Sequence, residues 1–180
     1  MDLDFSQNYF ELFGLPVAFD VDATTLAATF RDLQSQLHPD RFATADEKQR
    51  RLSVQGASWV NEAFHTLKDP MRRARYLLEL KGVDFNDETE TSSDPEFLME
   101  QMELREALGE VREAPDPWAA LDEVGDRIRA HDRALTDTFR TAFVAGDYAA
   151  AKDAVLKMKF FRRLQEELER LEAELEDELA

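Results

Sequence analysis

The tripeptide His38-Pro39-Asp40, called the HPD turn below, combines the residue types best suited to act on another molecule. Taken alone it predicts a structural turn, because aspartate readily accepts bonds from nearby backbone amides where a chain leaves a helix. Proline fixes the backbone, so Asp40 would be presented at a low entropic cost on binding. A carboxylate held in this way can accept a bidentate bond from an arginine of a partner. The turn is therefore a candidate contact site.

Other residues that often carry chemistry are poorly arranged for it. His38, His65 and His131 fall in different segments without the spacing of paired ligands, so we expect no metal site. The chain has no cysteine, which excludes a thiolate ligand, a cysteine nucleophile and a disulfide framework. The adjacent carboxylates Glu166 and Glu167 belong to a charged helix rather than a pocket, and no glycine-rich loop is present to hold a phosphate. We expect a protein that is not an enzyme and needs no cofactor.

Negative charge is concentrated in the second half of the chain. Residues 1–82 contain 10 Lys and Arg against 12 Asp and Glu, whereas residues 83–180 contain 12 against 27, within a net charge of −17. Such a balance repels phosphate backbones and anionic lipids, so we expect no nucleic acid and no membrane among the partners. No apolar run approaches the roughly 18 residues of a membrane span, and no secretory signal is evident. A soluble, cytoplasmic protein is expected.

Helical periodicity dominates, so the predicted fold class is all-α. A short helix over residues 8–13 should end at Gly14, and a second helix, capped by Asp22, must stop at His38 because a residue before proline leaves the helical region. A third helix over residues 47–68 turns Leu52 and other residues inward. A fourth helix opens at Pro70 and ends before Gly82. The second and third helices thus form an antiparallel hairpin around the HPD turn.

The second half predicts three further helices, over residues 95–114, 117–145 and 147–179. Residues 83–94 are polar, acidic and rich in Thr and Ser, which indicates a linker. Because the breaks between the three helices are short, they should pack as an antiparallel three-helix bundle. Leucines recur in the last helix at near-heptad spacing, which fits packing within the bundle or, less well, a dimeric coiled coil. The coiled coil would make the chain a helical interaction protein that dimerises through its C-terminal helix; the four leucines are Leu164, Leu168, Leu171 and Leu175.

The order of segments around the HPD turn is similar to that of the J-domain of the DnaJ class, over residues 5–76. The segments are residues 9–16 (YFELFGLP), the helix after Asp22, the HPD turn with Arg41, and residues 60–70 (VNEAFHTLKDP). The resemblance implies that the partner is a DnaK-class chaperone and that the turn stimulates its ATP hydrolysis. J-domains usually carry several cations on the second helix, whereas this helix offers Arg31 alone, so steering of the encounter should be weak. The chaperone-binding residues implied are Arg31, His38, Pro39, Asp40 and Arg41.

The rest of the chain resembles HscB, the co-chaperone family of iron-sulfur cluster assembly. Residues 94–106 (DPEFLMEQMELRE) resemble the opening of the C-terminal domain of that family, as do residues 76–78 and 157–160 at their positions. The resemblance implies an L-shaped protein of the bacterial type, with a J-domain over residues 1–82, a linker over 83–94 and a C-terminal three-helix scaffold-binding domain over 95–180. Its implied partners are an HscA-like DnaK-class chaperone and an IscU-like scaffold protein.

Helix 95–114 carries two distinct faces. At about 100° per residue, Phe97, Leu104, Leu108 and Val111 share one narrow arc that can face the bundle. Leu98, Met99 and Met102 lie outside this arc, and three glutamates share the far face with Met99. An apolar strip bordered by carboxylates suits a partner with exposed hydrophobic and basic residues, although packing on the J-domain or linker is the alternative.

The resemblance assigns this strip to binding of the scaffold protein. Phe160, from the last helix, is added by the same resemblance, although Phe160 and Phe161 both flank the leucine stripe and either can belong to the core. The implied scaffold-binding residues are Leu98, Met99, Met102, Glu103, Glu106, Glu110 and Phe160.

Overall fold

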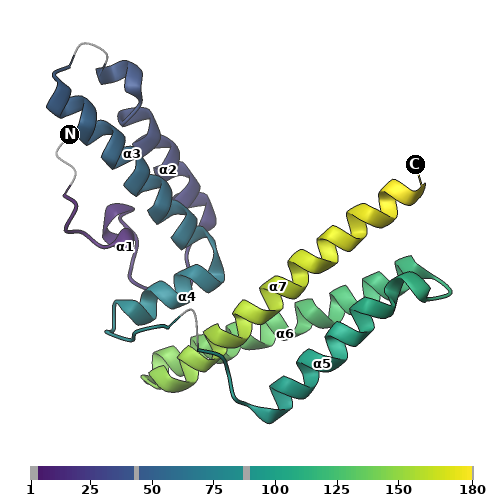
Figure 1. Cartoon of the computed structure of the whole chain (residues 1–180). Coiled ribbons are helices and arrows are strands. Elements are labelled where there is room, and N and C mark those ends of the chain that lie inside the picture. The colour runs from purple at the N-terminus through teal and green to yellow at the C-terminus, as the bar shows by residue number, and fades with distance from the viewer. Residues whose placement is uncertain (1–3, 43–44, 87–89, 180) are drawn as a thin grey trace. The chain divides into compact units, whose positions relative to one another are not determined.

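In the computed structural model, every regular element of the described residues, 4–42, 45–86 and 90–179, is a helix. The all-α prediction is confirmed. The chain divides into two compact units, Met1–Lys81 and Gly82–Ala180, and each is described by itself. In chain order the elements are α1 (Tyr9–Leu12), α2 (Ala23–Gln36), η1 (Pro39–Phe42), α3 (Glu47–Lys68), α4 (Pro70–Glu79), α5 (Pro95–Glu110), η2 (Val111–Glu113), α6 (Pro117–Ala145) and α7 (Tyr148–Leu179), as Figure 1 shows.

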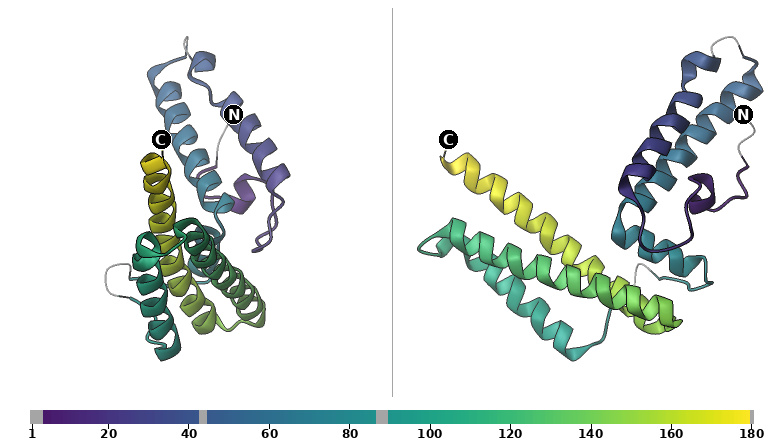
Figure 2. Two further views of the ribbon diagram at one scale, coloured as in Figure 1. Left: turned by 90° about the vertical axis from the view of Figure 1, so that its right-hand side faces the viewer. Right: turned by 180° about the vertical axis from the view of Figure 1, so that it is seen from behind.

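The first unit is built on the hairpin of α2 and α3, which lie side by side in both views of Figure 2. Asp22 caps α2 by accepting from the backbone N–H of Thr24, and Asp46 caps α3 in the same way from Gln49. Buried leucines of α2 pack toward Val60, Ala63 and Leu67 of α3. The rings of Phe30 and Phe64 stack with centroids 3.9 Å apart. These contacts make the hairpin a rigid support for the turn at its end.

One side-chain assignment in α3 was wrong. Leu52, predicted to face inward, is 43% exposed. Ser53 and Gly56, predicted to face inward with it, are buried. Small residues let α3 approach the end of α2 closely, and the side chain one position earlier is then turned by about 100° toward solvent.

Helices α1 and α4 are joined to each other through a tyrosine pair. The rings of Tyr9 and Tyr76 stack at 4.4 Å, and the backbone N–H of Tyr9 donates to the Tyr76 hydroxyl at 3.0 Å. Burial raises the pKa of Tyr76. Phe10 is fully buried, and Gly14 takes the left-handed conformation, with φ of 64°, that was predicted after the first helix.

The second unit is a bundle in which α6 and α7 form the longest contact, with α5 packed beside them (Figure 2). Helix α6 has the bounds predicted from the sequence, with Asp116 as its N-cap and Gly146, at a φ of 76°, as its C-cap. The last predicted turn of α5 is instead the 3-10 helix η2. The core consists of Phe97, Leu104, Leu108, Val111, Leu121, Val124, Ile128, Phe160, Phe161, Leu164, Leu168 and Leu175.

The leucine stripe of α7 faces this core. Leu164, Leu168 and Leu175 are buried within the bundle, and Leu171 packs against the same cluster. Packing within the chain therefore accounts for the residues that a dimeric coiled coil would need at its seam. The observation favours the intramolecular interpretation.

Residues 83–94, predicted to be a linker, are non-helical where they are described and pack on α7 within the second unit. Lys152 of α7 forms an ion pair with Glu90 at 2.5 Å, and Lys157 forms one with Asp94 at 2.6 Å. The hydrogen bond from Lys157 lowers the pKa of Asp94. Ser92 is buried between these two anchors. This segment fixes the chain that leads into α5.

Candidate functional site

The HPD turn follows directly from the sequence around it. Helix α2 ends at Gln36, with Leu37 as its C-cap, because His38 precedes a proline. The side chain of Leu37 is buried, and its carbonyl accepts a hydrogen bond of 3.0 Å from the Ser53 hydroxyl of α3. The base of the turn is thereby tied to the opposite helix, although the sequence analysis gave Ser53 no such role.

Beyond this anchor the turn projects into solvent. The side chains of His38 and Asp40 are 58% and 91% exposed. The backbone N–H of Asp40 donates to His38 Nδ1 at 3.3 Å, and the same nitrogen lies 3.5 Å from Asp40 Oδ2. Nδ1 can accept in the first contact only when it carries no proton, and it can donate in the second only when it carries one. Pro39 begins η1, and its side chain lies outside the described residues. The turn therefore leaves the Asp40 carboxylate exposed to solvent, and its contact with a partner stays a prediction.

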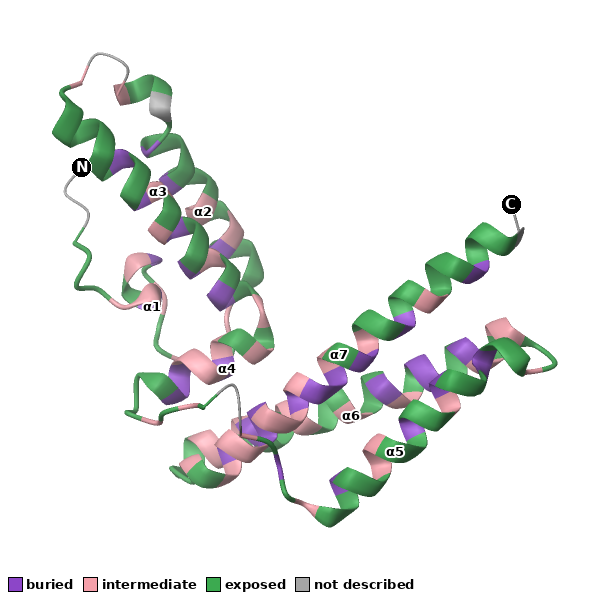
Figure 3. Cartoon of the chain, viewed as in Figure 1, coloured by how far each residue is buried: buried purple, intermediate pink, exposed green. Residues whose placement is uncertain are grey.

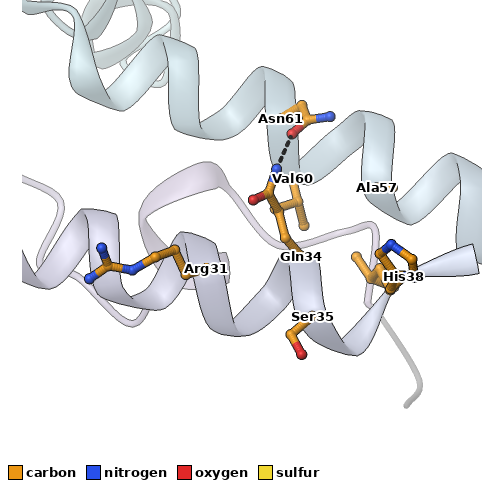
Figure 4. A pocket seen from close by; sticks show the side chains of 8 residues that line it. Arg31, Gln34, Ser35, His38, Ala57, Val60 and Asn61 are labelled. Carbon is orange, nitrogen blue, oxygen red and sulfur yellow. Dashed lines mark hydrogen bonds between the residues drawn. The ribbon is translucent and has the colours of Figure 1, made fainter. Parts of the chain in front are cut away.

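A hollow of about 410 Å³ lies beside the turn, between α2 and α3. In Figure 4, Arg31 and His38 lie toward its two ends and Gln34 donates to Asn61 across it, at 3.4 Å. Two predicted chaperone-binding residues, Arg31 and His38, thus line one surface. The exposed side chain of Arg41 lies in η1 and does not line the hollow.

Positive charge near the turn comes mainly from outside α2. Arg31 is the single Lys or Arg of that helix, as the sequence analysis notes. The first turns of α3 add three exposed cations, and Arg51 among them pairs with Glu47. This group was not predicted, although its signal, a cluster of basic residues soon after the turn, is visible in the sequence. The three residues are Lys48, Arg50 and Arg51.

Removing the anchor of the turn should loosen it. We expect Ser53→Ala to lower the free energy of unfolding by about 1–2 kcal/mol, because the buried Leu37 carbonyl loses its donor. Urea unfolding of the full chain measures this change. The matched control is Ser58→Ala, because Ser58 is exposed on the same helix. Equal stability of the two variants would contradict the role of Ser53.

The second candidate site is the outer face of α5. Phe97, Leu104 and Leu108 are buried, as the helical periodicity predicts. The apolar strip is exposed, by 45% at Leu98, 64% at Met99 and 73% at Met102. Figure 3 shows exposed residues along this helix. The strip therefore lies on a solvent-facing side of α5.

Carboxylates border this strip. Glu103, Glu106 and Glu110 are exposed on the same helix, and Glu103 Oε2 lies 3.7 Å from a guanidinium nitrogen of Arg127 in α6. The alternative of packing on the linker applies in part to Leu98, which lines a hollow with Ser92. The α5 face thus combines apolar and acidic groups on one surface.

Phe160 lies largely in the core, with 8% of its surface exposed. Its ring meets Phe97 edge to face at 5.5 Å, and Phe161 is buried beside it. The sequence left open which of the two phenylalanines belongs to the core, and both do. The part of Phe160 that remains accessible lines the hollow that Leu98 also lines. The role of Phe160 in binding stays a prediction, and it depends on this small accessible part of the ring.

The other two histidines take part in packing between side chains. His131 stacks on Phe161 at 5.1 Å and its Nε2 lies 2.6 Å from Glu100 Oε1, which joins α6 to α5. His65 packs against Phe64. Among the described residues, no group of three or more His, Cys, Asp or Glu side chains is arranged to hold a metal ion. Within the same residues, no helix combines the length and apolar character needed to cross a membrane.

Comparison with known proteins gives consistent matches over most of the chain. Residues 93–169 match the family model described as the HSCB C-terminal oligomerisation domain. The co-chaperone protein HscB homolog of Vibrio cholerae serotype O1 is 47% identical over 168 residues, which cover 93% of this chain and 98% of that protein. The structure of the chaperone HscB from Vibrio cholerae is similar with a TM-score of 0.87 and 46% identity, covering 94% of this chain and 99% of that one. The crystal structure of the human co-chaperone protein HscB also gives a TM-score of 0.87, at 31% identity, covering 94% and 84%.

Proposed function

The chain belongs to the HscB family of co-chaperones, and from this premise we propose that it binds an IscU-like scaffold protein, delivers it to an HscA-like DnaK-class chaperone and stimulates the ATPase of that chaperone. In this role it promotes the maturation of iron-sulfur proteins in the bacterial cytoplasm. The chain itself performs no reaction and holds no cofactor.

The single observation that carries this proposal is the exposed carboxylate of Asp40 on a rigid hairpin. Its backbone is restrained by the anchor between Ser53 and Leu37, while its side chain is free to meet an arginine of the chaperone. A planar guanidinium binds a carboxylate through two parallel hydrogen bonds, so the contact also fixes orientation. Arg31 and His38 would extend the contact along the hollow beside the turn, and Arg41 and the cations of α3 would add attraction for an acidic partner surface.

The outer face of α5 supports the second half of the proposal. Exposed Leu98, Met99 and Met102 give an apolar patch that a scaffold protein would cover, and methionine side chains adapt to a partner of irregular shape. The glutamates beside the strip suit lysine or arginine residues around the hydrophobic contact of the scaffold. Because the HPD turn and this strip belong to different units of the chain, one molecule can engage both partners.

An ATPase assay with purified components tests the proposed function. We expect the chain to raise steady-state ATP hydrolysis by the HscA-like chaperone, and chain plus IscU-like scaffold to raise it more than the sum of their separate effects. The synergy follows because delivery makes the encounter of scaffold and chaperone intramolecular. Absence of any stimulation by the chain would contradict the co-chaperone role, and purely additive effects would contradict delivery.

A second candidate function is self-association through α7, since the matched family model is described as an oligomerisation domain. Burial of Leu164, Leu168 and Leu175 within the bundle gives it less support. Sedimentation equilibrium separates the two, because a monomer is sufficient for delivery and a dimer is required by the alternative.

A further inference from the structure

A second hollow, of about 290 Å³, lies in the C-terminal unit where the segment before α5 meets α5 and α7. Ser92, Leu98 and Phe160 form part of its wall. The apolar strip of α5 therefore continues, through Leu98, into a concave surface that a partner side chain can enter. Helical periodicity does not predict this hollow, because the hollow forms where three segments of the chain meet.

The charge of this hollow is opposite to that of its surroundings. Residues 83–180 contain 12 Lys and Arg against 27 Asp and Glu, yet Arg105, Lys159 and Arg163 all line the same hollow. Glu90 also lines it, but that carboxylate forms an ion pair with Lys152 at 2.5 Å. Arg105 and Arg163 thus bring positive charge beside exposed apolar surface in an acidic unit, which favours an anionic group at this hollow.

The two arginines are placed to act on one ligand group. Arg105 of α5 holds its guanidinium over the ring of Phe160, at 5.4 Å from the ring centre. Arg163 of α7 lies three residues after Phe160, on the same side of its helix. Among the described residues, no carboxylate forms an ion pair with Arg105 or Arg163. Two guanidinium groups at one rim favour a carboxylate, which accepts several charge-assisted hydrogen bonds.

We propose that this cationic hollow binds an acidic side chain of the scaffold protein, next to an apolar residue that packs on Leu98. The inference rests on the proposed scaffold-binding function. Glu103, Glu106 and Glu110 suit basic residues of the scaffold, and the hollow adds a contact with one acidic residue. The scaffold-binding site then carries charges of both signs, with carboxylates along the outer side of α5 and cations at the hollow. Such an arrangement allows one orientation of the bound segment, because reversing it places like charges together.

Single substitutions test the inference in the full chain, with purified IscU-like scaffold protein as the probe. We expect Arg163→Gln and Arg105→Gln each to weaken binding about tenfold, the effect of losing one charge-assisted contact. Isothermal titration calorimetry at two salt concentrations measures the affinity, whose salt dependence should fall in both variants. The matched control is Arg133→Gln on α6, which removes the same charge from an exposed position outside the hollow and should leave binding unchanged.

A second measurement identifies the acidic residue of the scaffold. Each exposed Asp or Glu of the scaffold is changed to its amide, and its effect on binding is measured with the unaltered chain and with the Arg163→Gln variant. For one of these scaffold residues, the substitution should weaken binding to the unaltered chain but not to the variant. Scaffold binding by the unaltered chain together with affinities within twofold for both arginine variants would overturn the cationic site and leave the proposed function intact. Failure of the unaltered chain to bind the scaffold would overturn both. Arg163→Lys, which retains the charge, should recover part of the affinity, and no recovery would also count against the site.

Discussion

Asp40→Asn is expected to abolish stimulation of the chaperone ATPase without changing the fold. The Asp40 side chain is 91% exposed, and its described contact is the long one to His38. The amide has nearly the volume of the carboxylate, so the helical content should stay the same and the stability should change by no more than about 0.5 kcal/mol. The amide cannot accept two bonds from an arginine, however, because one of its two polar atoms is a donor.

The size of the loss follows from the charge pair. Truncating one partner of a hydrogen-bonded charge pair at an interface costs about 2–5 kcal/mol, which is at least about 30-fold in affinity. At chaperone concentrations near the dissociation constant, such a loss removes nearly all stimulation. Steady-state ATP hydrolysis measures it, and circular dichroism checks the fold.

Asp32→Asn is the matched control for this prediction. Asp32 is exposed on α2 of the same hairpin, does not line the hollow beside the turn, and undergoes the same loss of charge. We expect it to retain stimulation. If Asp40→Asn also retained full stimulation, the HPD turn would not be the contact that acts on the chaperone.

Local sequence signals predict the helices of this chain closely. Helix α6 has the predicted bounds, Pro117–Ala145, because Asp116 caps it, Pro117 suits its first turn and Gly146 takes the left-handed conformation after it. Each of these effects depends on residues within one turn of the helix end. The same holds for the HPD turn, since the proline alone dictates where α2 stops.

Contacts between distant residues were not predictable in this way. The segment before α5 has a linker composition, but Asp94 is held by Lys157, 63 residues later in the chain. Leu52 fits the inner face of α3 by periodicity and is exposed because Ser53 and Gly56 set the close approach of the helices. Phe160 could not be told from Phe161, because α5 packs on both. Periodicity reports which face of a helix is apolar and gives no information on the partner that covers it.

Paired substitution of Leu98 and Met102 by alanine is expected to weaken scaffold binding strongly. Their side chains are 45% and 73% exposed, so truncation should lower the stability of the chain less than a change in the core would. On binding, each side chain would transfer apolar surface from water, worth about 1.5–3 kcal/mol when fully buried. Because only the exposed part of each side chain can be transferred, together they should weaken binding by about 2–3 kcal/mol, which is about 30- to 150-fold. Stimulation of the chaperone ATPase by the chain alone should persist, since the HPD turn belongs to the other unit.

Two further variants serve as comparisons for this prediction. Val144→Ala removes an apolar side chain that is exposed on α6 and should leave scaffold binding unchanged. Phe160→Ala, by contrast, should destabilise the bundle by about 3–5 kcal/mol, because a buried ring is lost from the contact with Phe97. A loss of binding in that variant would therefore reflect unfolding as well as contact. The paired variant locates the scaffold on α5 only if it loses scaffold binding while its thermal stability and its ATPase stimulation are retained. Unimpaired binding would mean that the scaffold docks elsewhere.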